Sequence, residues 1–451
     1  MNQFQQKNVM QRKDLPPGPP YFESCSSSAG SGRGMLLVNV ASVILALCPV
    51  LALLLDVSSP ELSEAHARIY VVYLIALLLV VFLGVAARLS LDRKRLAAIA
   101  SEPGRLLGVR TNWLFLVIIT WMLATTLLIG PEKGRGLFKI GEICLVVAFG
   151  LAISDLSKAG GPHAMARLWW VLALGFTIAA VASVAVQLES PERYGSGGSA
   201  GFIHIRMFGF SLAAAIAILT GFLAHSRGLR RRYAVCLAGL TVLWCVLFWT
   251  ASRGGIATTI FATLLCAMFF VQLREVLVPW VAAIVVGFLL SLPIPGYFST
   301  GTLTAIDHEM TVESLGAGRL NIWSNVLTLI GQSPWTGHGY AQFPALMEVH
   351  NPDLVRVAHA HNIVLESLLA VGIPGTLILA AAAIVVWFRW IFDVRKDNTV
   401  DRLAAFLVIT VLYGYSFVDA VYYYPQSLLF FAVAVGILGS RQAQRPPKEI
   451  D

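Results

Sequence analysis

The sequence predicts an all-α membrane protein with about twelve transmembrane helices. Of its 451 residues, 57% are hydrophobic and only 13% are charged, and the mean hydropathy is +0.73. Soluble chains carry about 25% charged residues. The apolar residues fall in runs of about 15 to 22, which is the length of a helix that crosses a bilayer. A transmembrane β-barrel would instead show short segments of alternating polarity.

The order of apolar and polar stretches divides the chain. Residues 1–34 are polar and rich in Pro, Ser and Gly, which is typical of a disordered tail and not of a cleaved signal peptide. Nine spans are expected within 35–293, then a large loop at 294–361, three more spans within 362–440, and a tail at 441–451. The predicted spans are 35–55, 69–90, 112–129, 138–154, 168–187, 207–224, 234–250, 256–272, 279–293, 362–392, 403–421 and 425–440.

Basic residues predict the orientation. They concentrate in alternate loops, at 91–95, 227–232 and 393–397. Because positive loops stay in the cytoplasm, both tails are expected there and the 294–361 loop on the outer face. The net charge of +8 reflects this bias and does not indicate a nucleic-acid partner.

The large outer loop contains the elements of a lid. Apolar residues recur at helical spacing from Arg319 to Ile330, which predicts an amphipathic helix over the membrane surface or a cavity. Gly337-His338-Gly339-Tyr340 then predicts a turn.

The stretch from His359 to Gly375 organises the rest of the chain. His361 and Asn362 stand where the loop enters a membrane helix, and Gly372-Ile373-Pro374-Gly375 predicts a break in that helix. A histidine has a pKa near neutrality, so His361 under a lid is suited to handle a proton. The alternative is that His361 and Asn362 only cap the helix, since asparagine is a good N-cap.

Arginines on the outer face require an explanation, because that face is otherwise poor in basic residues. Arg206 opens a span, Arg253 precedes two glycines between spans, and Arg319 opens the predicted lid helix. Guanidinium groups bind phosphate in bidentate fashion, so these residues are candidates to bind a pyrophosphate carried on a lipid. The alternative is that they anchor helix ends at the interface. A further outer basic cluster suits either an anionic headgroup or no ligand: Lys133, Arg135 and Lys139.

A metal site is not expected. Five histidines share the outer loop, but their spacing matches no zinc signature, and His359-Ala360-His361 alone is a weak signal. The loop histidines are His308, His338, His350, His359 and His361.

Together these motifs resemble the O-antigen ligase and polymerase family. The resemblance rests on His361-Asn362 followed by Gly372-x-x-Gly375, on Gly318-Arg319-x-x-Ile322-Trp323, and on Pro334-x-x-Gly337-x-Gly339-Tyr340. Ser252-Arg253-Gly254, two spans earlier, also fits. The likeness is close from Arg206 to Phe392, whereas the first five spans match only as apolar segments.

The resemblance implies a glycosyltransferase of the bacterial inner membrane whose active site faces the periplasm. Such enzymes take a glycan from undecaprenyl pyrophosphate and need no cofactor. By motif, His361 resembles the essential histidine, and Arg253 and Arg319 resemble the essential basic residues. Arg206 is a less secure match, and His338, His359, Tyr340 and Asn362 are expected to line the substrate site.

The resemblance leaves several acceptors open. The ligase passes the glycan to lipid A-core, the polymerase to another lipid-linked repeat, and a third branch to a protein hydroxyl. The short C-terminal tail disfavours the third branch, and the ligase is the preferred interpretation. A transporter of an anionic lipid-linked substrate is the alternative from another class, but it should place its charges near mid-membrane.

Overall fold

The computed structural model describes residues 32–58, 62–90, 109–190, 199–202, 204–294, 319–354, 357–419 and 421–440. Within these ranges the chain is helical, and its only strand-like pairing is an isolated bridge between Ser199 and Phe202. The two tails and residues 295–318 of the large loop, which include His308, lie outside the described residues.

A helix lies on each predicted span. These helices are α2 (Gly32–Ser58), α3 (Leu62–Ser90), α5 (Val109–Leu128), α6 (Lys133–Gly160), α7 (Pro162–Glu189), α9 (Ile205–His225), α10 (Arg230–Trp249), α11 (Arg253–Phe269), α13 (Leu277–Ser291), α18 (Ile363–Lys396), α19 (Val400–Ser416) and α20 (Pro425–Gly439).

Seven of the helices in the described ranges are long and apolar enough to cross a membrane, so the protein is a multi-pass membrane protein. The count of twelve crossings stays a prediction. Two predicted spans end early: α11 stops at Phe269 before the short α12 (Val271–Arg274), and α19 stops at Ser416.

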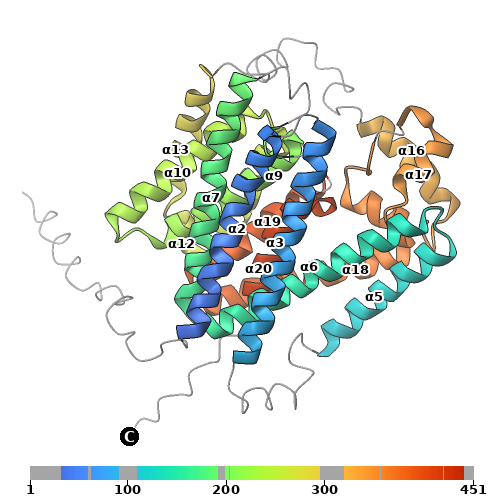
Figure 1. Ribbon diagram of the computed structural model, residues 1–451, viewed down its shortest axis with the longest axis horizontal. Coiled ribbons are helices and arrows are strands. Elements are labelled where there is room, and N and C mark those ends of the chain that lie inside the picture. Colours follow the sequence, from blue (N-terminus) through green and yellow to red (C-terminus); the bar gives the residue numbers. More distant parts are fainter. Residues whose placement is uncertain are drawn as a thin grey trace, which may run out of the picture.

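Helix α9 forms the centre of the bundle. Figure 1 shows it among α7, α10 and α19, all of which it contacts. Most of its side chains are small or apolar, and its two hydroxyl side chains, Ser211 and Thr220, donate hydrogen bonds to the carbonyls of Met207 and Ile216 in the preceding turn. A helix whose hydroxyl groups are hydrogen-bonded to its own main chain can be buried on all sides.

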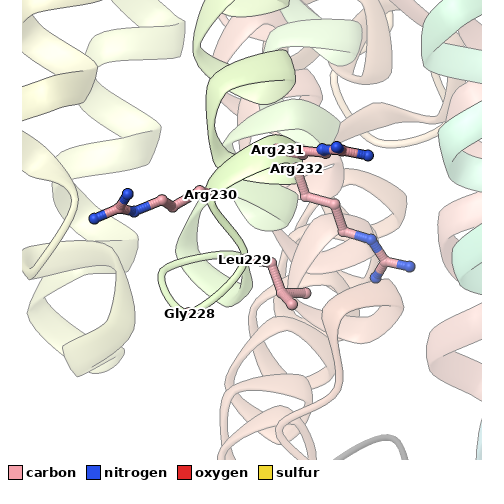
Figure 2. A pocket seen from close by; sticks show the side chains of 5 residues that line it. All are labelled: Gly228, Leu229, Arg230, Arg231 and Arg232. Carbon is pink, nitrogen blue, oxygen red and sulfur yellow. The ribbon is translucent and has the colours of Figure 1, made fainter.

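Two basic stretches lie at one end of the bundle. His225, at the end of α9, hydrogen-bonds through Nε2 to the carbonyl of Asn398, in the turn between α18 and α19. This contact places the basic stretches 227–232 and 393–397 at the same end of the bundle. The sequence predicts both stretches on one side of the membrane, and the two agree. Figure 2 shows the arginines of residues 230–232 around a hollow at that end, with Arg230 pointing away from the other two.

The lid has a hydrophobic core of its own. Helix α16 (Arg319–Gln332) confirms the predicted amphipathic helix and buries Ile322, Val326, Leu329 and Ile330. These side chains pack against Phe343 and Met347 of α17 (Phe343–His350) and against Leu369 of α18. In Figure 1, α16 and α17 lie to one side of the bundle, beside α18 and α5.

The predicted break in α18 is confirmed, and the lid is docked on it. Gly372 leaves the helical conformation with φ of 70°. Pro374 has no N–H, so the carbonyl of Ala370 has no partner within the helix. The turn at 334–339 compensates, since the N–H groups of His338 and Gly339 donate to Leu369 and Ala370 at 2.7 and 3.0 Å. In return, Ile373 N–H donates to Pro334 O at 2.8 Å.

Glycine is required on both sides of this contact. A Cβ on Gly372 would lie 2.4 Å from Trp335 O, and one on Gly337 would lie 2.5 Å from the carbonyl carbon of Ala370. Two motifs about 35 residues apart in sequence therefore form a single main-chain junction between the lid and the membrane helix.

Candidate active site

Two helices and two turns bring a charged cluster together around Asp419. His361 Nδ1 lies 2.7 Å from Asp419 Oδ1. Arg319 Nη2 and Arg206 Nε lie 3.5 and 3.8 Å from Oδ2 of the same carboxylate. The Asp419 side chain is only 3% exposed, whereas those of Arg206 and Arg319 are 36% and 24% exposed. The carboxylate is thus held at the base of the cluster and the guanidinium groups remain partly open to solvent.

His361 is fixed in both backbone and ring. Its φ of 53° is left-handed, a conformation that residues other than glycine seldom adopt. Because a carboxylate can only accept, the 2.7 Å contact requires Nδ1–H to donate, and Nε2 then carries the lone pair. Arg206 Nη1 lies 3.1 Å from Nδ1 and 3.2 Å from Nε2, so its guanidinium is in close contact with both ring nitrogens.

Burial and the two arginines keep His361 neutral. Burial lowers the pKa of the imidazole most strongly, and the charges of Arg206 and Arg319 lower it further. The hydrogen bond and the charge of Asp419 act in the opposite direction. The net shift is downward, so near neutral pH the ring is unprotonated and available as a base.

Arg319 lies in a strongly positive region. Burial is the main cause that lowers its pKa, Asp419 counteracts it, and the charges of Arg206 and Arg253 add to the lowering. Arginine remains charged even so. One carboxylate therefore contacts two guanidinium groups, and the charge of Arg253 acts on Arg319 from nearby, which is an environment suited to an anion.

Arg253 stands apart from the Asp419 contacts. It begins α11, is exposed, and makes no ion pair with another described residue. The preceding Ser252 bonds through its hydroxyl to that of Tyr415 on α19, at 2.6 Å. Arg253 is thus held beside the cluster with its guanidinium directed to solvent or a ligand.

His359 adjoins His361 and packs against two tyrosines. The two imidazole rings meet edge to face with centroids 4.2 Å apart, and His359 Nε2 lies 3.2 Å from the hydroxyl of Tyr424. Burial, with His361 next in effect, lowers the pKa of His359 to about 3. His359 is therefore a permanently neutral neighbour of the base.

Asn362 is the N-cap of α18, which is the alternative that the sequence left open. Its Oδ1 accepts from the N–H groups of Val364 and Leu365, and its Nδ2 donates to the carbonyl of Phe417. Asn362 therefore links the start of α18 to the end of α19, two residues before Asp419.

His338 and Tyr340 are not brought into the cluster. The ring of His338 donates through Nε2 to the carbonyl of Leu329 at 2.8 Å. The N–H of Tyr340 donates to the hydroxyl of Thr126 on α5, at 3.0 Å. The contacts that the structure gives these two residues hold the lid turn, and a role in substrate binding stays a prediction.

Two residues of the outer basic cluster at the start of α6 contact neighbouring side chains. Lys139 pairs with Glu142 at 2.7 Å and lies 4.5 Å from the ring centroid of Tyr423. Arg135 Nη2 lies 3.5 Å from the Tyr423 hydroxyl. These contacts hold the turn that carries Tyr423 and Tyr424 beneath His359.

Three of these side chains have the donor atoms of a metal site. The ligand atoms of His359, His361 and Asp419 lie within 4.8 Å of one another. However, the guanidinium groups of Arg206 and Arg319 already supply positive charge to Asp419. The set therefore fits an incoming anion better than a cation, and independence from metal stays a prediction.

Asp419 is the residue that the sequence analysis missed. It lies inside the predicted span 403–421, where no motif distinguishes it. The available signal was its charge, because an ionisable residue within an apolar stretch near a membrane edge is a candidate functional residue by default.

The arrangement can perform one kind of chemistry. A neutral imidazole oriented by a carboxylate can take a proton from a hydroxyl, and adjacent guanidinium groups can stabilise negative charge on a leaving group. Proton removal and anion stabilisation at the same place are what the transfer of a group from a phosphate ester to a hydroxyl requires.

Comparison with known proteins agrees with this chemistry. Residues 238–380 match a family described as O-antigen ligase. The chain is also 33% identical over 148 residues to the general O-oligosaccharyltransferase of Acinetobacter baylyi, an alignment that covers 31% of this chain and 25% of that protein. The matched part of the chain spans about a quarter of the length of this relative. Both findings support glycosyl transfer of the O-antigen ligase type.

Proposed function

We propose, from the O-antigen ligase domain that this chain carries, that it moves O-antigen polysaccharide from undecaprenyl pyrophosphate to lipid A-core on the periplasmic face of the inner membrane. The observation that carries the proposal is that His361 and two arginines all contact the same buried carboxylate, that of Asp419. The basic ends of α9 and α18, opposite this cluster, support its periplasmic orientation.

The acceptor hydroxyl attacks the anomeric carbon of the donor glycan. Its proton passes to Nε2 of His361 while Nδ1–H stays bonded to Asp419. The bond from the anomeric carbon to the pyrophosphate oxygen breaks, and the electron pair leaves with undecaprenyl pyrophosphate. Direct displacement inverts the anomeric configuration, and no carboxylate nucleophile is assigned.

The arginines hold the pyrophosphate. Arg319 and Arg206 are each partly exposed next to Asp419, and Arg253 presents a guanidinium with no ion pair among the described residues. In the present arrangement Arg206 Nη1 lies 3.2 Å from Nε2 of His361. Movement of its guanidinium onto a phosphate would uncover Nε2, so donor binding would itself prepare the base.

Two other acceptors belong to the same chemistry. The relative in Acinetobacter baylyi is named a general O-oligosaccharyltransferase, and a protein hydroxyl is the second candidate acceptor. Polymerisation of lipid-linked repeats is the third candidate, and transport of an anionic lipid-linked substrate is the alternative outside enzymes.

The decisive experiment uses the purified protein in lipid nanodiscs with an undecaprenyl-pyrophosphate-linked glycan. Lipid A-core, a second lipid-linked repeat and a hydroxyl-bearing acceptor protein are supplied in separate reactions. We expect glycan on lipid A-core and an inverted linkage. Product on another acceptor would reassign the branch, and movement of intact donor across the bilayer without transfer would overturn the proposal.

A further inference from the structure

The main chain of Ala360, the residue between the two histidines, is held through both its N–H and its carbonyl. The N–H of Ala360 donates to Glu366 Oε2 at 2.9 Å. The carbonyl of Ala360 accepts from Trp323 Nε1 at 3.0 Å. Ala360 and Glu366 are buried, so water does not offer an easy replacement for either partner.

The next residue in the chain is the one under strain. His361 has a left-handed backbone conformation, which persists in a residue other than glycine only where the surroundings enforce it. From this conformation its ring reaches Asp419 at 2.7 Å. The orientation of the Ala360 peptide therefore controls where the imidazole lies.

Glu366 does not simply cap its own helix. Asn362 already accepts from Val364 and Leu365, the free N–H groups at the start of α18. Glu366 instead reaches back outside the helix to Ala360, while its own N–H donates to the carbonyl of Asn362. A buried carboxylate that serves a single loop peptide is expensive to retain for helix formation alone.

Trp323 connects this peptide to the lid. It lies one turn after Arg319 on α16, so the helix that brings Arg319 to Asp419 also fixes Ala360. Helix α16 therefore fixes the proposed base, His361, relative to Arg319, which is one of the proposed phosphate ligands.

We propose that Glu366 and Trp323 are positioning residues that clamp the Ala360 peptide and so hold His361 in place for transfer, without contacting either substrate. This inference rests on the proposed glycosyl transfer. The clamp should appear in kcat and not in the KM of the donor, because the residues that bind pyrophosphate are left intact.

The test compares four single variants of the full-length protein in the nanodisc transfer assay. Glu366→Leu removes the acceptor of the Ala360 N–H and is expected to lower kcat roughly 10- to 100-fold, since a misplacement of about 1 Å costs on that order. Glu366→Gln keeps an oxygen that accepts the N–H and should retain at least about a third of kcat. Trp323→Phe removes the indole N–H together with part of the ring volume and should lower kcat roughly 3- to 10-fold.

Matched controls change the same residue types away from the clamp. Glu348→Gln on α17 and Trp335→Phe in the lid turn alter exposed side chains and should leave kcat unchanged. The double variant Trp323→Phe/Glu366→Leu should lose less than the product of the two single losses, because both act on one peptide.

Each outcome separates the clamp from the alternatives. Unchanged kcat in both Glu366→Leu and Trp323→Phe would overturn it, and so would a raised donor KM at constant kcat. If Glu366→Gln is as impaired as Glu366→Leu, the charge matters and the clamp is wrong. Should Glu366→Leu fail to fold, Trp323→Phe and Glu366→Gln still decide. Absence of transfer by the unaltered protein would instead remove the proposed function.

Discussion

Replacing Asp419 with asparagine removes the charge that orients the proposed base while changing almost no volume. The contact between His361 Nδ1 and Asp419 Oδ1 is 2.7 Å long and buried. A hydrogen bond to a charged group contributes about 1.5–3 kcal/mol. At about 1.36 kcal/mol for each tenfold in rate, kcat should fall roughly 10- to 150-fold. An asparagine amide that donates to Nδ1 would also place the imidazole proton on Nε2. Nε2 could then no longer accept a proton from the acceptor hydroxyl.

Donor binding should respond differently to this variant. Arg206 and Arg319 lose their shared counter-charge, so their attraction for pyrophosphate is not weakened. We therefore expect a KM for the donor that is unchanged or lower. A fall in kcat without a rise in KM is the signature of a residue that acts on the chemical step.

The pH profile provides a second measurement. The hydrogen bond and the charge of Asp419 both raise the pKa of His361 against the larger effect of burial. Their loss lowers that pKa further, and the base is active when unprotonated. The acidic limb of kcat/KM should therefore shift to lower pH in the Asp419→Asn variant, while the reduced plateau persists at higher pH.

Initial rates across pH 4–9 in nanodiscs, with a thermal-unfolding measurement on each variant, make this test. Asp393→Asn is the matched control, because Asp393 pairs with Arg389 in an exposed contact at the other end of α18. Wild-type kcat in a folded Asp419→Asn protein, or an acidic limb shifted to higher pH, would refute the assignment of Asp419 as the orienting group.

Four further predictions address the remaining assignments. His361→Asn should remain folded yet lose roughly 10²–10⁴-fold in turnover, whereas a stable and fully active variant would reduce His361 to a helix cap. Arg253→Lys and Arg319→Lys should rescue the corresponding alanine variants poorly, because lysine lacks the planar fork, and wild-type rates in both lysine variants would exclude bidentate binding. Transfer should survive EDTA, and loss of activity that a divalent ion restores would show a metal requirement. A reporter fused after Lys396 should report cytoplasm and one near Ser314, outside the described residues, periplasm; exchanged signals would reverse the orientation.

The sequence predicted those features that arise from local composition. Apolar runs located the helices, since burial of a helix in lipid needs only length and hydropathy. The break at Gly372 was predictable because proline lacks an N–H, and the lid helix from Arg319 because its apolar residues recur at helical spacing.

The features that arise from tertiary contact could not be predicted in this way. Asp419 becomes significant only because α19 ends beside His361 and Arg319, which no local pattern records. Nor could the sequence show that the turn at 334–339 supplies the N–H groups that α18 lacks at its break. The strained backbone of His361 is likewise set by Glu366 and Trp323, which come from two different helices.

The main-chain junction between the lid and α18 has a consequence for how such proteins diversify. Hydrogen bonds between backbone groups make demands on Gly337, Gly372 and Pro374 but almost none on the side chains between them. The junction therefore places no demand on the exposed face of α17. Hybrids that inherit residues 334–375 as one block keep the junction whole, whereas a crossover inside the block pairs a turn with a helix that did not evolve beside it.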